Sequence, residues 1–368
     1  MLVGALAVPV PCSTQAKVSA QNSDTGRFSI DYSGVELFWK TYDVLSQDRE
    51  PTPALWDELF SNPGYAALER KEHKRSVLNE AFRIAYKPSY KERIAPALER
   101  GDFTSQIIPH LLDVPSKKRL LDNYLASLRD TRWLSRALDR TQTLMPEGLT
   151  RQHAPPPISF IIFAPDARGY ADIVVVDLLA LEKNFDPEGF LAHEFFHYYR
   201  RFFATRYSTT TDKEPLLNVL ENAQEEGTAD QLDKRRVPFL SEEELKSLVP
   251  NDGDRSFFDD YRRAYANANY WLGRVESVLQ DHASGSKEAP DSARSLKKAI
   301  PIDGRPLGAF MARTIQDVLG LQKLASVSGD ALSFWLLYNE AARKSSGRAR
   351  VLSQPAIEMI SRLRADSK

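Results

Sequence analysis

The sequence has little cysteine, little net charge and no long apolar stretch. Its 368 residues include one cysteine, Cys12, so no disulfide can form within the chain. The 49 Lys and Arg residues nearly balance the 50 Asp and Glu residues, so no strong field would attract nucleic acid or an anionic membrane. After the N-terminus, no apolar run approaches the ~20 residues that a membrane span needs. These absences argue against nucleic-acid-binding and membrane-spanning proteins.

The N-terminus has most features of a secretory signal peptide. Residues 1–20, MLVGALAVPVPCSTQAKVSA, begin with an apolar run and continue with small residues, and cleavage is expected after Ala16 or Ala20. A basic segment before the apolar run is missing. We expect export to the periplasm or secretion, with a cytoplasmic location as the alternative. Cys12 would leave with the peptide, unless it carries a lipid anchor, for which the preceding VPVP is a poor match.

The remaining chain is predicted to be mainly α, in an α+β class with one small sheet. Apolar residues recur at three- and four-residue spacings through 27–154, which predicts an N-terminal helical region. The same pattern returns in a C-terminal helical region, 241–368. Between them, 155–240 is predicted to be a catalytic core. Its β-branched runs ISFIIFA (158–164) and ADIVVVD (171–177) predict two strands, joined by the turn-rich link PDARGY.

The motif HEFFH lies within DPEGFLAHEFFHYYRRFF and is predicted to be helical. Asp186 suits the N-cap and Pro187 the first helical position. His193 and His197 are four residues apart, about one helical turn, so both project from one face and can reach a single ion. Glu194 is turned to the side.

This layout is typical of zinc catalysis. Two neutral imidazoles bind the ion with a third protein ligand, and the open position keeps a water whose pKa falls towards 7. Glu194 would take the proton of that water and pass it to the leaving amine. The pattern therefore predicts one zinc per chain, bound by His193 and His197, with Glu194 as the catalytic base.

The third ligand is expected on a second predicted helix, 216–234, in the segment EEGTAD. Glu226 and Asp230 lie one turn apart there, so Glu226 can bind the metal while Asp230 accepts the free N–H of a ligand histidine. Glu225 is the rival ligand, although its partner one turn later is an alanine. Glu221 is less well placed. Asn222, one turn before Glu226, is expected to help to hold the ligands.

HExxH followed on a later helix by Glu-x-x-x-Asp resembles the gluzincin zinc metallopeptidases, the thermolysin-like clan. The matching residues are His193, Glu194, His197, Glu226 and Asp230. HEFFHYY, EEGTADQLDK and DGRPLGAFMARTIQDVLG together also resemble bacterial families of predicted, largely uncharacterised zinc-dependent peptidases. The resemblance implies a zincin-like core with the sheet beside the HExxH helix, and a peptide or protein substrate. One departure is the gap of 28 residues between His197 and Glu226, which is wider than in thermolysin.

Two further features are expected from this resemblance. In the clan, the strand just upstream lies at the edge of the cleft and pairs with extended substrate, a role that would fall to 171–177. Alternatively, this segment is simply a buried strand. The clan also uses a Tyr, His or Arg to stabilise the oxyanion. The candidates are Arg305, which we favour, then Tyr270 and His282, each with an ordinary structural role as the alternative.

Three functions are compatible with these residues. The first is a zinc metallopeptidase. The second is a scaffold that binds zinc or a partner but no longer cleaves, which the intact Glu194 argues against. The third is a zinc hydrolase that acts on a non-peptide amide or ester, because the same activated water serves both reactions.

Overall fold

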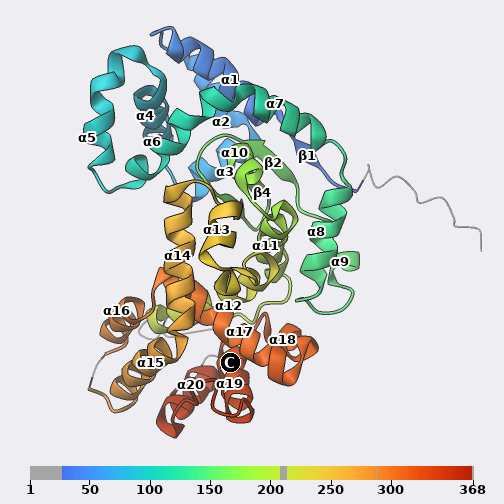
Figure 1. Ribbon diagram of the computed structural model, residues 1–368, viewed down its shortest axis with the longest axis vertical. Helices are drawn as coiled ribbons and strands as arrows, with labels where there is room; N and C mark the ends of the chain where they lie inside the picture. Colours follow the sequence, from blue (N-terminus) through green and yellow to red (C-terminus); the bar gives the residue numbers. More distant parts are fainter. Residues whose placement is uncertain (1–26, 208–213, 287, 367–368) are drawn as a thin grey trace, which may run out of the picture.

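A computed structural model describes residues 27–207, 214–286 and 288–366. The predicted signal peptide, 1–20, and Cys12 lie outside these residues. Part of the loop between the helix that carries HEFFH and the helix that carries EEGTAD also lies outside them. The fold is mainly helical with one small sheet, as predicted. Figure 1 shows the sheet near the middle of the molecule, with the first helices at one end and the last helices at the other. Among the described residues, no helix is both long and apolar enough to cross a membrane.

Before the second strand the chain is almost entirely helical. A short strand opens this part, and the helices that follow lie above and beside the sheet in Figure 1. The elements are β1 (Ile30–Asp31), α1 (Ser33–Ser46), α2 (Pro53–Ser61), α3 (Pro63–Lys71), α4 (Arg75–Tyr86), α5 (Ile94–Leu98), α6 (Phe103–Asp113), α7 (Lys118–Ser127), α8 (Arg132–Gln142) and α9 (Leu149–Gln152).

The sheet has four strands in the order β1, β2, β4, β3. β2 (Ile158–Ile161) and β4 (Val174–Asp177) confirm the two predicted strands, although both are shorter than predicted. β1 and β2 are parallel, as are β2 and β4, whereas β3 (Ala167–Gly169) runs antiparallel to β4. β3 lies within the segment that was predicted to be only a turn-rich link. Its three residues include a glycine and an arginine, so they carry little of the apolar pattern that reveals a strand.

The strand order shows that the expectation of an edge strand at 171–177 was wrong. The strand at 171–177 lies between β2 and β3, and all four residues of β4 are buried, which agrees with the alternative of a buried strand. The edge strand next to β4 is β3, and β1 forms the other edge of the sheet. β3 lies beside the helix that carries HEFFH, α11 (Pro187–Arg200).

The remaining helices complete the core and the far end of the molecule. A connected cluster of buried apolar side chains extends from Phe28 to Leu363, and the division of the chain at 155 and 241 stays a prediction. The elements are α10 (Leu178–Lys183), α11, α12 (Glu214–Asp233), α13 (Glu242–Leu248), α14 (Asp252–Ala266), α15 (Ala268–Ala283), α16 (Ala289–Ala299), α17 (Arg305–Leu319), α18 (Leu321–Val327), α19 (Ala331–Lys344) and α20 (Gln354–Asp366). The 3₁₀ segment η5 (Ile302–Gly304) leads directly into α17.

Candidate metal centre

The helix that carries HEFFH begins as predicted. Asp186 is the N-cap of α11, and its carboxylate accepts a hydrogen bond from the backbone N–H of Gly189 at 3.0 Å. Pro187 is the first helical residue. Arg140 of α8 pairs with Asp186 at 2.8 Å, and Arg136 pairs with Glu188 in the first turn. These contacts fix where α11 starts, and therefore which face of it carries the two histidines.

Two close approaches place other elements against the site. A side chain at Gly169 of β3 would overlap the backbone oxygen of Glu194, so glycine lets the outer strand lie directly on α11. In the same way, Gly227 of α12 and Gly308 of α17 meet backbone to backbone, and a side chain at either would collide with the other helix. The second approach brings the start of α17 beside Glu226.

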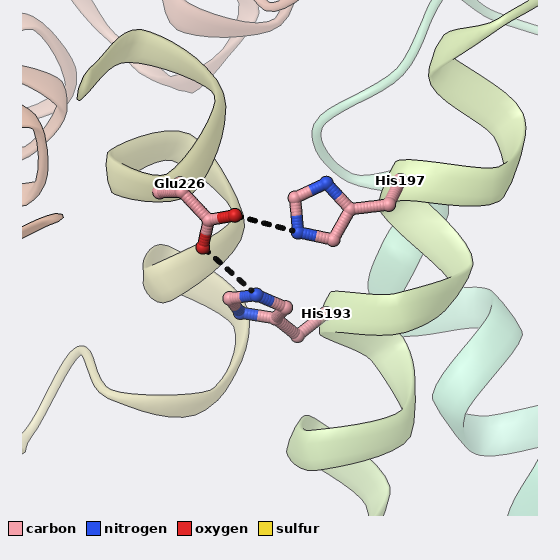
Figure 2. A group of neighbouring side chains, drawn as sticks. All are labelled: His193, His197 and Glu226. Carbon is pink, nitrogen blue, oxygen red and sulfur yellow. Dashed lines mark ion pairs between the residues drawn. The ribbon is translucent and has the colours of Figure 1, made fainter. Parts of the chain in front are cut away.

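The imidazoles of His193 and His197 face the carboxylate of Glu226 (Figure 2). His193 Nε2 lies 3.5 Å from Glu226 Oε2, and His197 Nε2 lies 3.6 Å from Glu226 Oε1. One ligand atom from each residue can be chosen so that all three lie within 4.8 Å of one another. The two histidines come from α11 and the glutamate from α12, as the sequence predicted.

The other nitrogen of each imidazole is held by a carboxylate. His197 Nδ1 lies 2.8 Å from Glu225 Oε1. His193 Nδ1 lies 3.2 Å from Asp233 Oδ1 and 3.5 Å from Asp230 Oδ1. An Nδ1–H that donates to a carboxylate leaves the lone pair of a neutral imidazole on Nε2, the atom that faces Glu226.

The carboxylates dominate the protonation of the site in the absence of a metal. Burial alone would lower the pKa of His193, but Asp233 and its other anionic neighbours raise it to about 10. Burial also lowers the pKa of His197, and Glu226 and Glu225 more than offset this, so the net shift is upward. Burial raises the pKa of Glu226, whereas His197 and Arg305 hold it well below its usual range. Glu226 is therefore ionised across the ordinary pH range.

This donor set fits a zinc ion. Two imidazole nitrogens and one carboxylate are a combination that catalytic zinc sites use, with a position left for water or substrate. Three anions lie beside the histidines, the partly buried Glu225 and Glu226 and the buried Asp233, and they favour a cation at this position. Second-sphere carboxylates on both imidazoles are also usual for metal-ligating histidines.

Glu194 lies in the same cleft as the three candidate ligands. The cleft has a volume of about 380 Å³ and is also lined by β3 and its flanking residues, by Glu225 and by Arg305. The Glu194 residue is only 6% exposed, yet its carboxylate has no hydrogen-bond or ion-pair partner among the described residues. A carboxylate placed in this way is available to a water molecule or a substrate in the cleft.

A scan against protein families decides the relationship of this chain. Residues 56–347 match the family described as "Putative zinc dependent peptidase (DUF5700)". The chain belongs to this family. A search of curated proteins and a search of solved structures each found no significant match. The description of the family thus includes zinc dependence and peptidase activity, both as "putative". In this chain, the candidate zinc ligands are His193, His197 and Glu226.

Arg305, the favoured oxyanion candidate, contacts two of the candidate zinc ligands. It is the first residue of α17, and its guanidinium Nε donates to Glu226 Oε2 at 2.6 Å. Its Nη2 lies 3.3 Å from His193 Nε2. Asn222 does not contact the candidate ligands directly. Its side chain instead donates to the backbone oxygen of Asp303 at 2.8 Å, which fixes the η5 turn that presents Arg305.

The structure does not bring the other two oxyanion candidates into the cleft. Tyr270, on α15, is 59% exposed, and its ring packs against Trp271. His282, on the same helix, lies 3.4 Å from the hydroxyl of Ser292. Neither residue lines the cleft of the candidate zinc ligands. Glu221, the weakest ligand candidate, pairs with Arg200 at 3.0 Å instead.

Sequence reasoning missed two carboxylates that hold the ligand histidines. Glu225 was considered only as a rival ligand, and Asp233 was not considered. Asp233 lies seven residues, about two turns, after Glu226, so the helical repeat that selected Asp230 also places Asp233 on that face. Glu225 carries no such signal, because its contact with His197 depends on how far α12 is rotated against α11.

Proposed function

We propose that the protein is a zinc-dependent metallopeptidase of gluzincin type, in which His193, His197 and Glu226 bind one zinc ion. One observation carries the proposal: both Nε2 atoms face the oxygens of Glu226, while both Nδ1 atoms are held by carboxylates. This arrangement orients three ligands from two helices toward one point. The family's description as a zinc-dependent peptidase supports it independently.

Glu194 is proposed to be the general base. Zinc bound here would supply a Lewis acid that makes a water acidic near neutral pH and polarises a carbonyl oxygen. Glu194 would accept the proton of the attacking water and deliver it to the leaving amine. Its position in the cleft and its lack of a partner among the described side chains support this role.

Arg305 is proposed to stabilise the negative charge that develops on the substrate's carbonyl oxygen. Its guanidinium lies in the cleft next to Glu226 and His193, so it is already placed beside the reacting centre. A cation that is already held in place costs little reorganisation during the reaction. Of the three donors considered from the sequence, Arg305 has this placement, whereas Tyr270 and His282 do not line the cleft.

The outer edge of β3 supports a peptide as the substrate at Gly169. Tyr170 N–H donates to the backbone oxygen of Ile173, and Asp177 N–H donates to that of Asp166, so alternate residues 166, 168 and 170 turn their peptide groups toward β4. By the alternation of an antiparallel ladder, the peptide groups of Ala167 and Gly169 face away from β4. Ala167 N–H donates to Asp166 Oδ1 and its carbonyl oxygen accepts from Arg168 Nη1, each at 2.9 Å, so pairing with a substrate would centre on Gly169. Gly169 lies on α11 beside Glu194, so an extended chain paired there would pass the proposed base.

We also propose that the protein acts after export, because residues 1–20 have the features of a signal peptide. Its substrate would then be a peptide or protein in the periplasm or outside the cell. The alternatives remain a zinc-binding scaffold without activity and a hydrolase of non-peptide amides or esters. The retained Glu194 opposes the first, and the outward peptide group of Gly169 beside Glu194 favours a peptide over the second.

The test is cleavage of a peptide library made from denatured proteins, with new termini identified by mass spectrometry. Zinc-loaded wild-type protein would be compared with Glu194→Gln, and with Glu340→Gln as a control, because Glu340 forms an exposed ion pair with Lys344 on α19. We expect Glu194→Gln to keep its zinc and to lose at least about 10²–10⁴-fold in activity, the usual contribution of a general base. Zinc binding without any peptide cleavage by the wild type would contradict the peptidase proposal.

A further inference from the structure

A second cluster of metal-ligating groups lies behind His193. The Nδ1 atom of His193 and the carboxylates of Asp230 and Asp233 offer ligand atoms that all lie within 4.8 Å of one another. All three residues are buried. His193 thus belongs to two clusters, one on each side of its ring. Nε2 faces Glu226 and His197, and Nδ1 faces the two aspartates.

The ammonium group of Lys234 already lies in this second cluster. Its Nζ is 3.0 Å from Asp230 Oδ1 and also pairs with Asp233 Oδ2. The side chain of Lys234 is only 12% exposed, so the charge of this ammonium is little screened by water. The remaining oxygen of Asp230, Oδ2, accepts a hydrogen bond from the hydroxyl of the fully buried Tyr261 at 2.9 Å.

Each cluster contains a cation, but the two cations are held differently. Two buried aspartates without a cation would attract a divalent metal, and His193 Nδ1 would complete a three-ligand set. With Lys234 in place, a metal would have to displace an ammonium that is paired with both aspartates, and would also have to remove the proton from Nδ1. On the other side of the ring, Arg305 contacts Glu226 Oε2 and lies 3.3 Å from His193 Nε2, whereas His197 Nε2 and Glu226 Oε1 face each other at the cleft.

We propose that the ammonium group of Lys234 prevents a metal ion from binding at the second cluster. His193 then binds metal only through Nε2, and the chain binds one metal ion. Lys234 is therefore a positioning residue, since it acts through Asp230 and Asp233 on His193. The inference rests on the proposed function, because it presupposes that His193, His197 and Glu226 bind a metal.

The test is cobalt binding by four full-length proteins: the wild type, Lys234→Met, His197→Ala and the double variant His197→Ala/Lys234→Met. Cobalt is used as a spectroscopic substitute for zinc, and bound equivalents, dissociation constants and visible spectra are measured after removal of other metals. We expect one equivalent in the wild type and much weaker binding in His197→Ala. The double variant should bind at least about tenfold more tightly than His197→Ala, with a different spectrum, because the second cluster is then open.

Two further variants in the His197→Ala background keep the test decisive. Lys234→Arg retains the positive charge and should bind cobalt as weakly as His197→Ala. Lys234→Gln is a second neutral variant, which replaces Lys234→Met if that protein does not unfold cooperatively in a thermal melt.

Equal cobalt affinity in His197→Ala with and without Lys234 would overturn the inference, and so would tight binding by His197→Ala with Lys234 intact. A wild type that binds no cobalt would be a different result, because it would remove the proposed metal centre itself.

Discussion

The Nε atom of Arg305 lies 2.6 Å from Oε2 of Glu226, so the proposed oxyanion donor is fixed by a proposed metal ligand. This contact joins α17 to α12 across the close meeting of Gly227 and Gly308. Helix packing therefore sets the position of the Arg305 guanidinium. This group holds Glu226 and also lines the cleft.

Replacing Arg305 by alanine is expected to slow cleavage without removing zinc. The loss of the oxyanion donor should reduce kcat by about 10²–10³-fold. Zinc should bind at least as tightly, because Glu226 no longer shares an oxygen with a guanidinium. Arg294→Ala, which breaks an exposed ion pair with Asp291 on α16, is the control and should leave both quantities unchanged. Loss of zinc from Arg305→Ala would show that the residue builds the metal centre instead.

The outer strand is expected to depend on Glu72, which follows α3. This carboxylate accepts hydrogen bonds from Arg168 Nε at 2.9 Å and from the hydroxyl of Tyr170 at 2.6 Å, on either side of Gly169. Glu72→Gln should loosen β3 and raise KM about five- to tenfold, equivalent to about 1 kcal/mol, with kcat changed much less. Steady-state kinetics on one cleaved peptide would measure this.

Glu80→Gln is the matched control for Glu72→Gln, because Glu80 forms an exposed ion pair with Arg100 in the same part of the chain. If KM is equal for the wild type and Glu72→Gln, the substrate does not rely on the position of β3.

The helix crossing at Gly308 is expected to tolerate no side chain. A methyl group there would overlap the backbone oxygen of Ala223, so Gly308→Ala should separate α12 from α17. We expect a loss of about 1–3 kcal/mol in the free energy of unfolding, measured by denaturant titration. Gly273→Ala in α15 is the control, because the nearest atom there, at 3.2 Å, belongs to the side chain of Arg350 and not to a backbone. An unchanged stability of Gly308→Ala would contradict the packing described.

Zinc binding is expected to release protons near neutral pH. Without metal, the anionic neighbours raise the pKa of His193 to about 10, so this ring is protonated at pH 7, and they also raise the pKa of His197 above its ordinary value. Only neutral imidazoles bind zinc, so at least about one proton should leave per ion and the apparent affinity should rise with pH. Calorimetry in buffers of different ionisation enthalpy counts these protons. Affinity that is independent of pH between 6 and 8 would contradict this assignment.

The sequence predicted the parts of the site that depend on local spacing. His193, Glu194 and His197 share one helix, and the cap at Asp186 fixes where that helix begins. The contact of Glu225 with His197 depends instead on how two helices pack, which no local pattern encodes. Asp233 lies on the face of Glu226 by the helical repeat, so the spacing could have identified it. The sequence did not predict strand β3 for another reason. Gly169 is needed there because β3 packs closely against α11, and glycine has a low propensity for strands. Asn222 was expected to help to hold the ligands, but its side chain donates to the backbone oxygen of Asp303.

The most direct measurement is the zinc content and zinc affinity of the wild type beside His197→Ala and Glu226→Ala. We expect one tightly bound zinc per wild-type chain. Each variant should bind zinc at least about 100-fold more weakly, because each lacks one of the three protein ligands. A wild type without zinc, or variants that bind zinc as tightly as the wild type, would contradict the proposed metal centre.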